Sequence, residues 1–486
     1  MARFREGFLV AMLLTLGVAS SAIPATAQFE TRSIFATNIG PSSVVTADFN
    51  RDGNMDIAVA FIIDSYAEVQ VFLGNGDGTF RHPTKYEVGY GTGPLAVADL
   101  NGDGNVDLVV ANQACPNNVC DDSVSVLLGN GDGTFQAPMA FRTPASAASL
   151  VLGDFNGDGK LDIATIDHTD YTRVCDCVSI LLGKGDGTFQ EPAIITTVSR
   201  YPEVLVAGHF TASKNLDLAV TMSLISSDEV QILLGNGDGT FSSGDIYPLA
   251  PNSISIVAAD FRNDHKTDLA IGEFEGRGVA VLLGNGDGTF EQPVVYSVVT
   301  VNGLAAGDLN GDGIIDLVAG SDTDPLGQVS VLRGKGNGTF EAAISYPAGE
   351  FPEAVAIADF NGDGKPDITM ADYLGNREFI LLNTGVVTFS PPTPLSFKSQ
   401  RHGTTSAPQT VMLSNTGKTE LRIAAMKTVG EFGVTSTCGE TVPAGEDCVI
   451  SVTFSPQTKG TKSGTVMIED TASSKPQVIE LTGVGT

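Results

Sequence analysis

The chain has 486 residues, of which 57 are acidic and 27 are lysine or arginine, and its formal net charge is −30. Such an acidic surface repels nucleic-acid phosphates and anionic headgroups, so we expect no nucleic-acid partner and no membrane insertion. The one long apolar run lies near the N-terminus and is too short to span a bilayer.

Residues 1–27 have the three parts of a secretory signal peptide. Arg3 and Arg5 precede the apolar run Phe8–Val18, and residues 25–27 form a small-residue cleavage site. A buried N-terminal helix is the alternative interpretation. We therefore expect a mature protein that is secreted or associated with the cell surface, and that is a monomer.

A nonapeptide of the form Asp-x-Asn-x-Asp-Gly-x-x-Asp recurs every 48 to 55 residues along the next part of the chain. Short β-rich runs flank each copy, and a glycine-rich string, Gly-Asn-Gly-Asp-Gly-Thr-Phe, follows the third run. Seven units of four short strands predict an all-β fold, a seven-bladed β-propeller. Five copies are intact and two are degraded: Asp48–Asp56, Asp99–Asp107, Asp154–Asp162, Asp308–Asp316 and Asp359–Asp367, then His209–Asp217 and Asp260–Asp268.

The N-terminal residues Phe29–Thr37 resemble the run that follows each Thr-Phe, such as Phe80–Val88. We therefore expect them to supply the outer strand of the seventh blade, because closing the ring with both chain ends removes an open edge. We interpret the glycine-rich string as a tight hairpin rather than as a second metal or phosphate site. Its phenylalanines are expected to pack between neighbouring blades: Phe80, Phe135, Phe189, Phe241, Phe290 and Phe340.

The repeat pattern stops near Ser390. We therefore divide the mature chain into a propeller at residues 28–389, a proline-rich linker at 390–394 and a second domain at 395–486. Alternating runs such as Cys448–Phe454 predict that the second domain is a β-sandwich that follows the propeller.

Six cysteines in an exported protein can form disulfides. Local pairing of Cys115 with Cys120 and of Cys438 with Cys448 is the simplest arrangement. Cys175 and Cys177 are so close that a mutual bridge would be strained, so pairing with the other insert stays open. A zinc site is a further alternative.

The five intact nonapeptides have the donor set that Ca²⁺ prefers, namely several hard oxygens on a flexible loop. In each copy the side chains at positions one, three, five and nine and the backbone carbonyl at position seven are candidate ligands. The loops lack the acidic twelfth residue of an EF-hand, and an asparagine- and aspartate-rich turn without an ion is the alternative. The candidates are Asp48, Asn50, Asp52, Asn54, Asp56; Asp99, Asn101, Asp103, Asn105, Asp107; Asp154, Asn156, Asp158, Lys160, Asp162; Asp308, Asn310, Asp312, Ile314, Asp316; and Asp359, Asn361, Asp363, Lys365, Asp367.

The two degraded copies lead to different expectations. Arg262 and His265 replace the asparagine and glycine in Asp260–Asp268, so calcium binding there is doubtful. The copy at His209–Asp217 keeps only its last aspartate, so we expect no ion. About five Ca²⁺ ions are therefore expected in all.

In their nonapeptide and glycine-rich string, residues 40–389 resemble the FG-GAP (VCBS-type) repeats that also build the propeller of integrin α chains. The resemblance implies a β-propeller with calcium in its hairpin loops. The C-terminal region resembles the immunoglobulin-like choice-of-anchor D type domains of bacterial surface proteins. Ser406–Asn415, the Cys438 and Cys448 pair and Thr453–Pro456 carry that second resemblance.

In a four-stranded blade the nonapeptide and the glycine-rich string lie on one face, and loops of variable sequence lie on the other. Recognition usually resides on variable loops held by a rigid scaffold, so calcium is expected to be structural and the ligand to bind the other face. The candidate loops are Ile62–Glu68, Asn112–Asp122, Asp167–Cys177, Ser223–Glu229, Gly272–Gly278, Ser321–Gln328 and Asp372–Glu378.

The sequence therefore predicts an extracellular binding or adhesion module for protein or glycan, and not an enzyme. A lectin is one alternative, although the chain has no tryptophan to stack on sugars and offers only Tyr66, Tyr171 and Tyr373 on these loops. A polysaccharide lyase is the other alternative. Against it, no Gly-x-Ser-x-Gly motif is present, and the histidines are dispersed at His82, His168, His209, His265 and His402.

Overall fold

The computed structural model describes residues 29–63, 66–89, 91–112, 122–168, 177–198, 201–223, 227–274, 278–322, 327–383, 387–390, 395–415, 420–443, 445–470 and 476–486. The described residues form 37 strands and no helix, as the all-β prediction requires. None of them lies in a helix that could cross a membrane. The expected signal peptide, residues 1–27, lies outside the described part of the chain.

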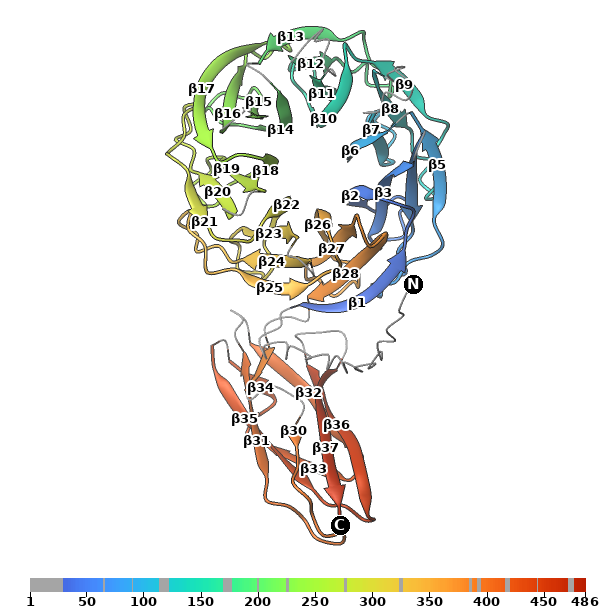
Figure 1. The fold of residues 1–486 in the computed structure, drawn as a ribbon, viewed down its shortest axis with the longest axis vertical. Coiled ribbons are helices and arrows are strands. Elements are labelled where there is room, and N and C mark those ends of the chain that lie inside the picture. The colour runs from blue at the N-terminus through green and yellow to red at the C-terminus, as the bar shows by residue number, and fades with distance from the viewer. Residues whose placement is uncertain are drawn as a thin grey trace, which may run out of the picture.

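Seven antiparallel sheets of four strands are arranged as blades around a central axis, which confirms the predicted seven-bladed propeller (Figure 1). Blades 1 to 4 consist of β2 (Pro41–Ala47), β3 (Asp56–Ile63), β4 (Tyr66–Phe72), β5 (Thr84–Val88); β6 (Thr92–Ala98), β7 (Asp107–Asn112), β8 (Ser123–Leu127), β9 (Met139–Arg142); β10 (Ser146–Gly153), β11 (Asp162–His168), β12 (Cys177–Leu181), β13 (Ala193–Thr197); and β14 (Pro202–Gly208), β15 (Asp217–Ser223), β16 (Asp228–Gly235), β17 (Phe241–Leu249). Blades 5 to 7 consist of β18 (Ser253–Ala259), β19 (Asp268–Glu273), β20 (Gly278–Leu282), β21 (Val294–Tyr296); β22 (Val301–Gly307), β23 (Asp316–Ser321), β24 (Gln328–Leu332), β25 (Ile344–Pro347); and β26 (Pro352–Ala358), β27 (Asp367–Asp372), β28 (Arg377–Asn383), β1 (Phe29–Ala36).

The two ends of the propeller sequence meet in blade 7. The N-terminal strand β1 pairs with β28 and forms the outer edge of that blade, as the sequence predicts. The innermost strands of successive blades lie side by side, and β26 of blade 7 lies beside β2 of blade 1. The ring is therefore closed, because the inner strand of every blade contacts the inner strands of both neighbouring blades.

Aromatic rings join neighbouring blades at the face that carries the nonapeptides. The phenylalanine of the glycine-rich string in one blade packs against the second nonapeptide residue of the preceding blade. Phe135 of blade 2 meets Phe49 of blade 1 with ring centroids 5.4 Å apart. Phe80 of blade 1 meets Phe360 of blade 7 at 5.8 Å, so the contact also spans the ring closure. The predicted packing of these phenylalanines between blades is confirmed.

A carboxylate is fully buried within blade 7, away from the nonapeptides. Glu378 on β28 accepts the hydroxyl proton of Thr369 at 2.5 Å, and burial raises the pKa of Glu378 to about 8. The pKa in the folded state therefore lies above the ordinary value of 4.5. The stability that the protonated side chain contributes is complete below about pH 4.5 and is lost as the pH rises through 8.

Glu378→Gln removes this ionisation while keeping the size of the side chain. Between pH 7 and pH 9 the wild type is expected to lose about 1.4 kcal/mol of unfolding free energy more than the variant loses. Urea unfolding at the two pH values measures the difference. Glu480→Gln on the exposed face of β37 (Gln477–Gly485) is the control. Equal losses in wild type and Glu378→Gln would contradict the assignment.

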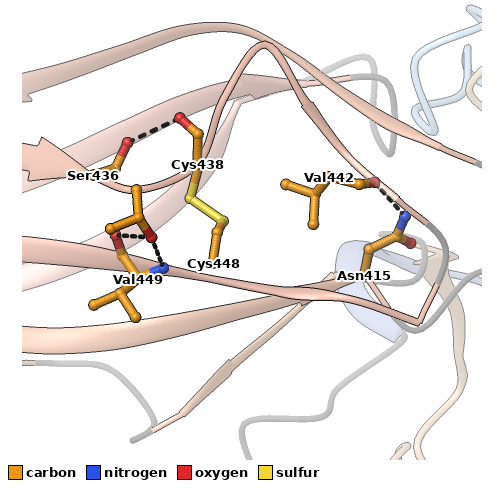
Figure 2. The surroundings of a disulfide bond; sticks show 7 residues. Asn415, Ser436, Cys438, Val442, Cys448 and Val449 are labelled. Carbon is orange, nitrogen blue, oxygen red and sulfur yellow. Dashed lines mark hydrogen bonds between the residues drawn. A yellow bond between two sulfur atoms is a disulfide. The ribbon is translucent and has the colours of Figure 1, made fainter.

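The C-terminal region is a β-sandwich of two sheets that share one apolar core. One sheet contains β29 (Val387–Ser390), β31 (Gln409–Asn415), β35 (Asp447–Phe454) and β33 (Phe432–Ser436). The other contains β30 (Leu395–Ser396), β37, β36 (Gly460–Asp470), β32 (Leu421–Val429) and β34 (Thr441–Val442). The predicted disulfide joins Cys438 to Cys448 and ties the segment after β33 to β35 (Figure 2).

The boundary between the two domains lies earlier than the sequence suggested. Strand β29 pairs with β31, although the repeat pattern predicts Val387–Phe389 in the propeller and Ser390 in the linker. The side chains of Val387 and Phe389 pack in the sandwich core. The physical reason is that β1 already pairs with the outer side of β28, so the residues that follow β28 cannot fold back onto it as the fourth strand of blade 7.

Of the four other cysteines, only Cys177 lies among the described residues, and it is disulfide-bonded. Cys115, Cys120 and Cys175 lie outside the described residues. The alternatives for their pairing therefore stay predictions.

Candidate calcium loops

Each nonapeptide joins the first strand of a blade to the second, and each glycine-rich string joins the third strand to the fourth. The two connections touch, because the amide of Gly74 in the string donates to Asp56 of the nonapeptide at 2.7 Å. In the string, Gly76 and Gly78 have φ angles of 71° and 77°, as a tight hairpin requires. Both recurrent motifs thus lie on one face of the propeller, and the string is a hairpin as predicted.

The ninth residue of the nonapeptide is a structural clamp. Oδ2 of Asp56 accepts the backbone N–H of Phe49 at 2.8 Å, and Oδ1 accepts that of Gly74. Equivalent pairs of hydrogen bonds occur in all seven blades, at Asp107, Asp162, Asp217, Asp268, Asp316 and Asp367. Sequence reasoning assigned this residue to calcium alone in the intact loops and missed the clamp.

A signal for the clamp was present in the sequence. The degraded copy His209–Asp217 has lost every acidic residue except the ninth. Asp217 is 1% exposed and accepts backbone N–H groups from Phe210 and Gly235 at 2.9 and 2.8 Å. The retention of an aspartate in a loop that we expect to bind no ion follows from this role.

The other acidic positions are held by the amides of their own loop. In the first copy, Oδ1 and Oδ2 of Asp48 accept the N–H groups of Asp52 and Gly53 at 3.1 and 2.8 Å. Asn50 accepts from Asp52, and Asp52 accepts from Asn54, each at 2.9 Å. The four other intact copies repeat the pattern with distances between 2.7 and 3.2 Å. Carboxylate oxygens have further lone pairs, so these bonds orient them without exhausting them as ligands.

Negative charge is concentrated at the buried end of each intact loop. Burial, helped by the neighbouring charges of Asp48 and Asp52, raises the pKa of Asp56 to about 6 against the lowering effect of its two backbone hydrogen bonds. The same causes raise the pKa of Asp316 to about 6 and that of Asp367 to about 7. A cation among these carboxylates would favour their charged forms.

One loop also contains an unpaired ligand atom. The side chain of Asp363 at position five is 5% exposed, and its Oδ2 has no hydrogen-bond partner among the described residues. The nearest cation is Nζ of Lys365 at 3.9 Å, which is too far for a hydrogen bond. An acceptor that is buried and unpaired fits the donor set of a metal site. Within the described ranges, however, no three His, Cys, Asp or Glu side chains converge closely enough to be counted as a metal-binding group.

The degraded loop of blade 5 contains a cation from the protein itself. The guanidinium of Arg262, at position three, lies 3.1 Å from Oδ1 of Asp268 and 3.6 Å from Oδ2 of Asp264. Asp260 keeps the loop bonds of an intact copy, to the amides of Asp264 and His265. Arg262 therefore stands among the same carboxylates that in other loops are candidate calcium ligands.

The degraded loop of blade 4 is closed by a different donor. Nδ1 of His209, at position one, lies 3.1 Å from the backbone oxygen of Asn215 at position seven. The hydroxyl of Thr211 also lies 3.4 Å from Oδ2 of Asp217. Position seven thus turns its carbonyl towards position one, which is the arrangement that the predicted ligand set requires.

Replacing the two unusual residues of blade 5 is expected to create a sixth site. The double variant Arg262→Asn, His265→Gly restores the donor set of an intact copy, and calcium titration should then show one more bound ion than in wild type. Arg262→Asn alone should destabilise the calcium-free protein, because Asp264 and Asp268 lose their cation. Thr211→Asn in blade 4, which restores only one of several lost ligands, is the control. An unchanged stoichiometry in the double variant would contradict the assignment.

The variable-loop face is only partly described. Six of the seven predicted loops contain residues that lie outside the described ones, Tyr171 among them, while Asp372–Glu378 is described in full. In that loop Asp372 accepts the amides of Glu350 and Phe351 at 3.0 and 2.9 Å and pairs with Arg377 at 3.1 Å. The ring of Tyr373 lies 6.1 Å from that of Phe351 and is 36% exposed.

Known proteins resemble the chain in separate parts. Residues 60–110, 99–165, 209–271, 266–319 and 308–370 match the FG-GAP-like repeat family. Residues 385–478 match the family described as Abnormal spindle-like microcephaly-assoc'd, ASPM-SPD-2-Hydin, or ASH. No curated protein matches the chain.

Two solved structures are similar to parts of the chain. The ASH / PapD-like domain 7 of human CEP192 is 15% identical, with 21% of this chain and 85% of that one covered and a TM-score of 0.16. A functionally unknown protein from Desulfotomaculum acetoxidans DSM 771 is 9% identical, with 70% and 92% covered and a TM-score of 0.46. Because the repeat matches cover more than half of its residues, the chain belongs to the FG-GAP-like repeat family, with an ASH domain after its propeller.

Proposed function

We propose that the five intact loops each bind one Ca²⁺ and that the propeller is an extracellular binding or adhesion module. The contrast between intact and degraded loops carries the calcium proposal. The two degraded loops supply their own donors, His209 and Arg262, to the oxygens that face the loop interior. At positions one and three, where the degraded loops have His209 and Arg262, the intact loops have aspartate and asparagine oxygens. An external cation could therefore bind to these oxygens.

The chemistry of the donor set favours calcium over other cations. Carboxylate, amide and backbone oxygens without sulfur or imidazole suit a hard cation, and a loop of five ligands over nine residues is flexible enough for the coordination of Ca²⁺. Position seven contributes only its carbonyl, so Asn54, Asn105, Lys160, Ile314 and Lys365 can differ in side chain. Calcium in these loops would join the first and second strands of a blade at their common end.

The calcium loops are proposed to be structural because each is bonded to the hairpin beside it. Ligand recognition is then assigned to the opposite, variable-loop face, where protein or glycan could bind. We propose a non-catalytic role: the clustered carboxylates of the described residues are held by backbone amides, and no nucleophile motif is present in the sequence. A polysaccharide-active enzyme and a lectin are the alternatives.

We further propose that the protein is exported to an oxidising compartment, and we propose a more specific type for each of its two domains. The disulfide between Cys438 and Cys448 fits secretion, as does the signal peptide expected at residues 1–27. We assign the repeats to the VCBS type and the sandwich to the choice-of-anchor D type on the motifs given above. Attachment to a cell surface through the sandwich would follow from that assignment.

Arrays of glycans and of extracellular-matrix proteins test the binding role. The calcium-loaded protein is expected to bind a defined class of ligand and to leave it chemically unchanged. Release of shorter saccharides from a bound polysaccharide would favour the enzyme alternative. Absence of binding on both arrays would contradict the module.

A further inference from the structure

A polar position recurs in the blades near the end of the second strand that is remote from the calcium loops. It follows the ninth nonapeptide residue by five positions and is occupied by Asn112, Asp167, Glu273, Ser321 and Asp372 in blades 2, 3, 5, 6 and 7. All five side chains are buried. Buried polar groups need partners, so each blade must satisfy this position or leave room for something that does.

In blade 2 the protein fills the position and pairs its amide nitrogen, although Oδ1 of Asn112 has no partner among the described residues, and in blade 3 it pairs the carboxylate. Nδ2 of Asn112 donates to the hydroxyls of Ser123 and Ser125 at 2.8 and 3.1 Å. Asp167 accepts hydroxyl protons from Thr165, at 3.1 Å, and from Ser179. The longer side chains of asparagine and aspartate reach the third strand and fill the space beside it.

In blade 6 a shorter side chain leaves the space open. Ser321 is 1% exposed, and its Oγ has no hydrogen-bond partner among the described residues. A cavity of about 390 Å³ lies beside it, between the outer strand of blade 5 and the third and fourth strands of blade 6. Ser330 and Ser345 also line the cavity, with their hydroxyl oxygens 2.8 Å apart. The buried, unpaired hydroxyl therefore lies in a space that can hold a ligand.

The lining of the cavity selects a class of ligand. Polar groups come from serine hydroxyls and from Gln328, and apolar walls come from Val298, Leu332 and the rings of Tyr296 and Phe340. Among the described residues of the lining, Glu341 at the exposed rim is the one acidic residue, and none is a lysine, arginine or histidine. Hydroxyls act as both donors and acceptors, and rings and aliphatic groups pack against C–H faces. A neutral ligand with many hydroxyls matches this surface, whereas an anion does not.

We propose that this cavity between blades 5 and 6 binds one residue of a neutral saccharide. Its volume lies in the lower part of the range found for small-molecule sites, which suits a single sugar ring. The inference deepens the proposed binding role by naming a ligand class and a site, and it rests on that role. It does not depend on calcium, because the lining contains no nonapeptide residue.

Saturation-transfer NMR with methyl β-D-glucopyranoside, methyl β-D-galactopyranoside and methyl α-D-mannopyranoside tests the proposal on the calcium-loaded, full-length mature protein. At least one of these neutral probes is expected to bind with a millimolar dissociation constant, and glucuronate is expected not to compete. Ser321→Asn places the blade 2 residue in the cavity and should weaken binding about tenfold or more. Ser243→Asn on the exposed strand β17 is the matched control and should bind as wild type does.

A second variant keeps the test valid if Ser321→Asn fails to fold. Ala342 is exposed at the mouth of the cavity, so Ala342→Tyr should obstruct entry without disturbing the core. Binding in both variants equal to wild type, no binding by any of the three probes, or full competition by glucuronate would each overturn the proposal. Calcium titration of the same samples distinguishes a failure of the saccharide proposal from a failure of the calcium proposal. The cavity variants should bind the same number of Ca²⁺ ions as wild type.

Discussion

Asp217→Ala is expected to lower the free energy of unfolding by about 4 kcal/mol, although the loop that contains Asp217 is expected to bind no calcium. The substitution leaves the backbone N–H groups of Phe210 and Gly235 without acceptors in a region where Asp217 is 1% exposed. Each unsatisfied buried donor costs about 1–3 kcal/mol, and the lost side chain leaves a small void. Urea unfolding in chelator and in calcium should give the same loss.

Ser213→Ala in the same loop is the control for Asp217→Ala. Ser213 is exposed and bonds only within the loop, to Thr211 and Asn215, so its loss is expected to change stability by less than about 0.5 kcal/mol. A loss for Asp217→Ala that is as small as that for Ser213→Ala would show that the clamp does not hold the blade. A loss that appears only in calcium would assign Asp217 to a metal site instead.

Calcium removal is expected to have the largest effect on the propeller. A ligand present at a hundredfold excess over its dissociation constant stabilises the folded state by about 2.7 kcal/mol per site. The five proposed sites lie in blades 6, 7, 1, 2 and 3, which form one continuous arc that includes the ring closure between β1 and β28. Chelation should therefore lower the melting temperature and loosen this arc first.

Hydrogen exchange followed by mass spectrometry locates the effect of chelation. Loop amides such as those of Gly53, Gly104 and Gly364 should exchange faster in chelator, whereas the blade 4 and 5 loops around Asn215 and His265 should not change. Equal acceleration in all seven loops would contradict the assignment of ions to the intact copies. Unchanged exchange and melting temperature would contradict calcium binding as a whole.

The stability of the calcium-free protein is expected to fall as the pH rises. The pKa values of Asp56, Asp316 and Asp367 are raised above the ordinary 3.8, to about 6 or 7. The stability contributed by their protonated forms is complete below about pH 4 and is lost as the pH rises through 6 to 7. Chelation should therefore lower the melting temperature more at pH 7.5 than at pH 4.5, since calcium offsets the charge of the ionised carboxylates.

The repeat period and the strand runs were sufficient to predict the propeller. The period counts the blades, and the similarity of Phe29–Thr37 to Phe80–Val88 gives the ring closure, because both features are local in sequence. The domain boundary was missed by a few residues. The apolar side chains of Val387 and Phe389 would suit the core of either domain. They are excluded from the propeller only because β1 already pairs with β28 in blade 7.

The candidate site was predictable in part. Oxygen ligands can be read from the nonapeptide, but the clamp role of the ninth residue depends on Gly74, which is 18 residues away from Asp56 and in another loop. The cavity in blade 6 depends on the absence of a longer side chain at Ser321 and on the neighbouring blade. Neither contact is visible in a single repeat, since both arise from tertiary packing.

Calorimetric titration of chelator-treated wild type with Ca²⁺, beside Asp154→Asn and Asp217→Asn, tests the central claim most directly. We expect about five ions in wild type, one fewer in Asp154→Asn because an intact loop loses a negative charge and one carboxylate oxygen, and an unchanged number in Asp217→Asn. Fewer than three ions in wild type, or the loss of an ion in Asp217→Asn, would contradict that claim.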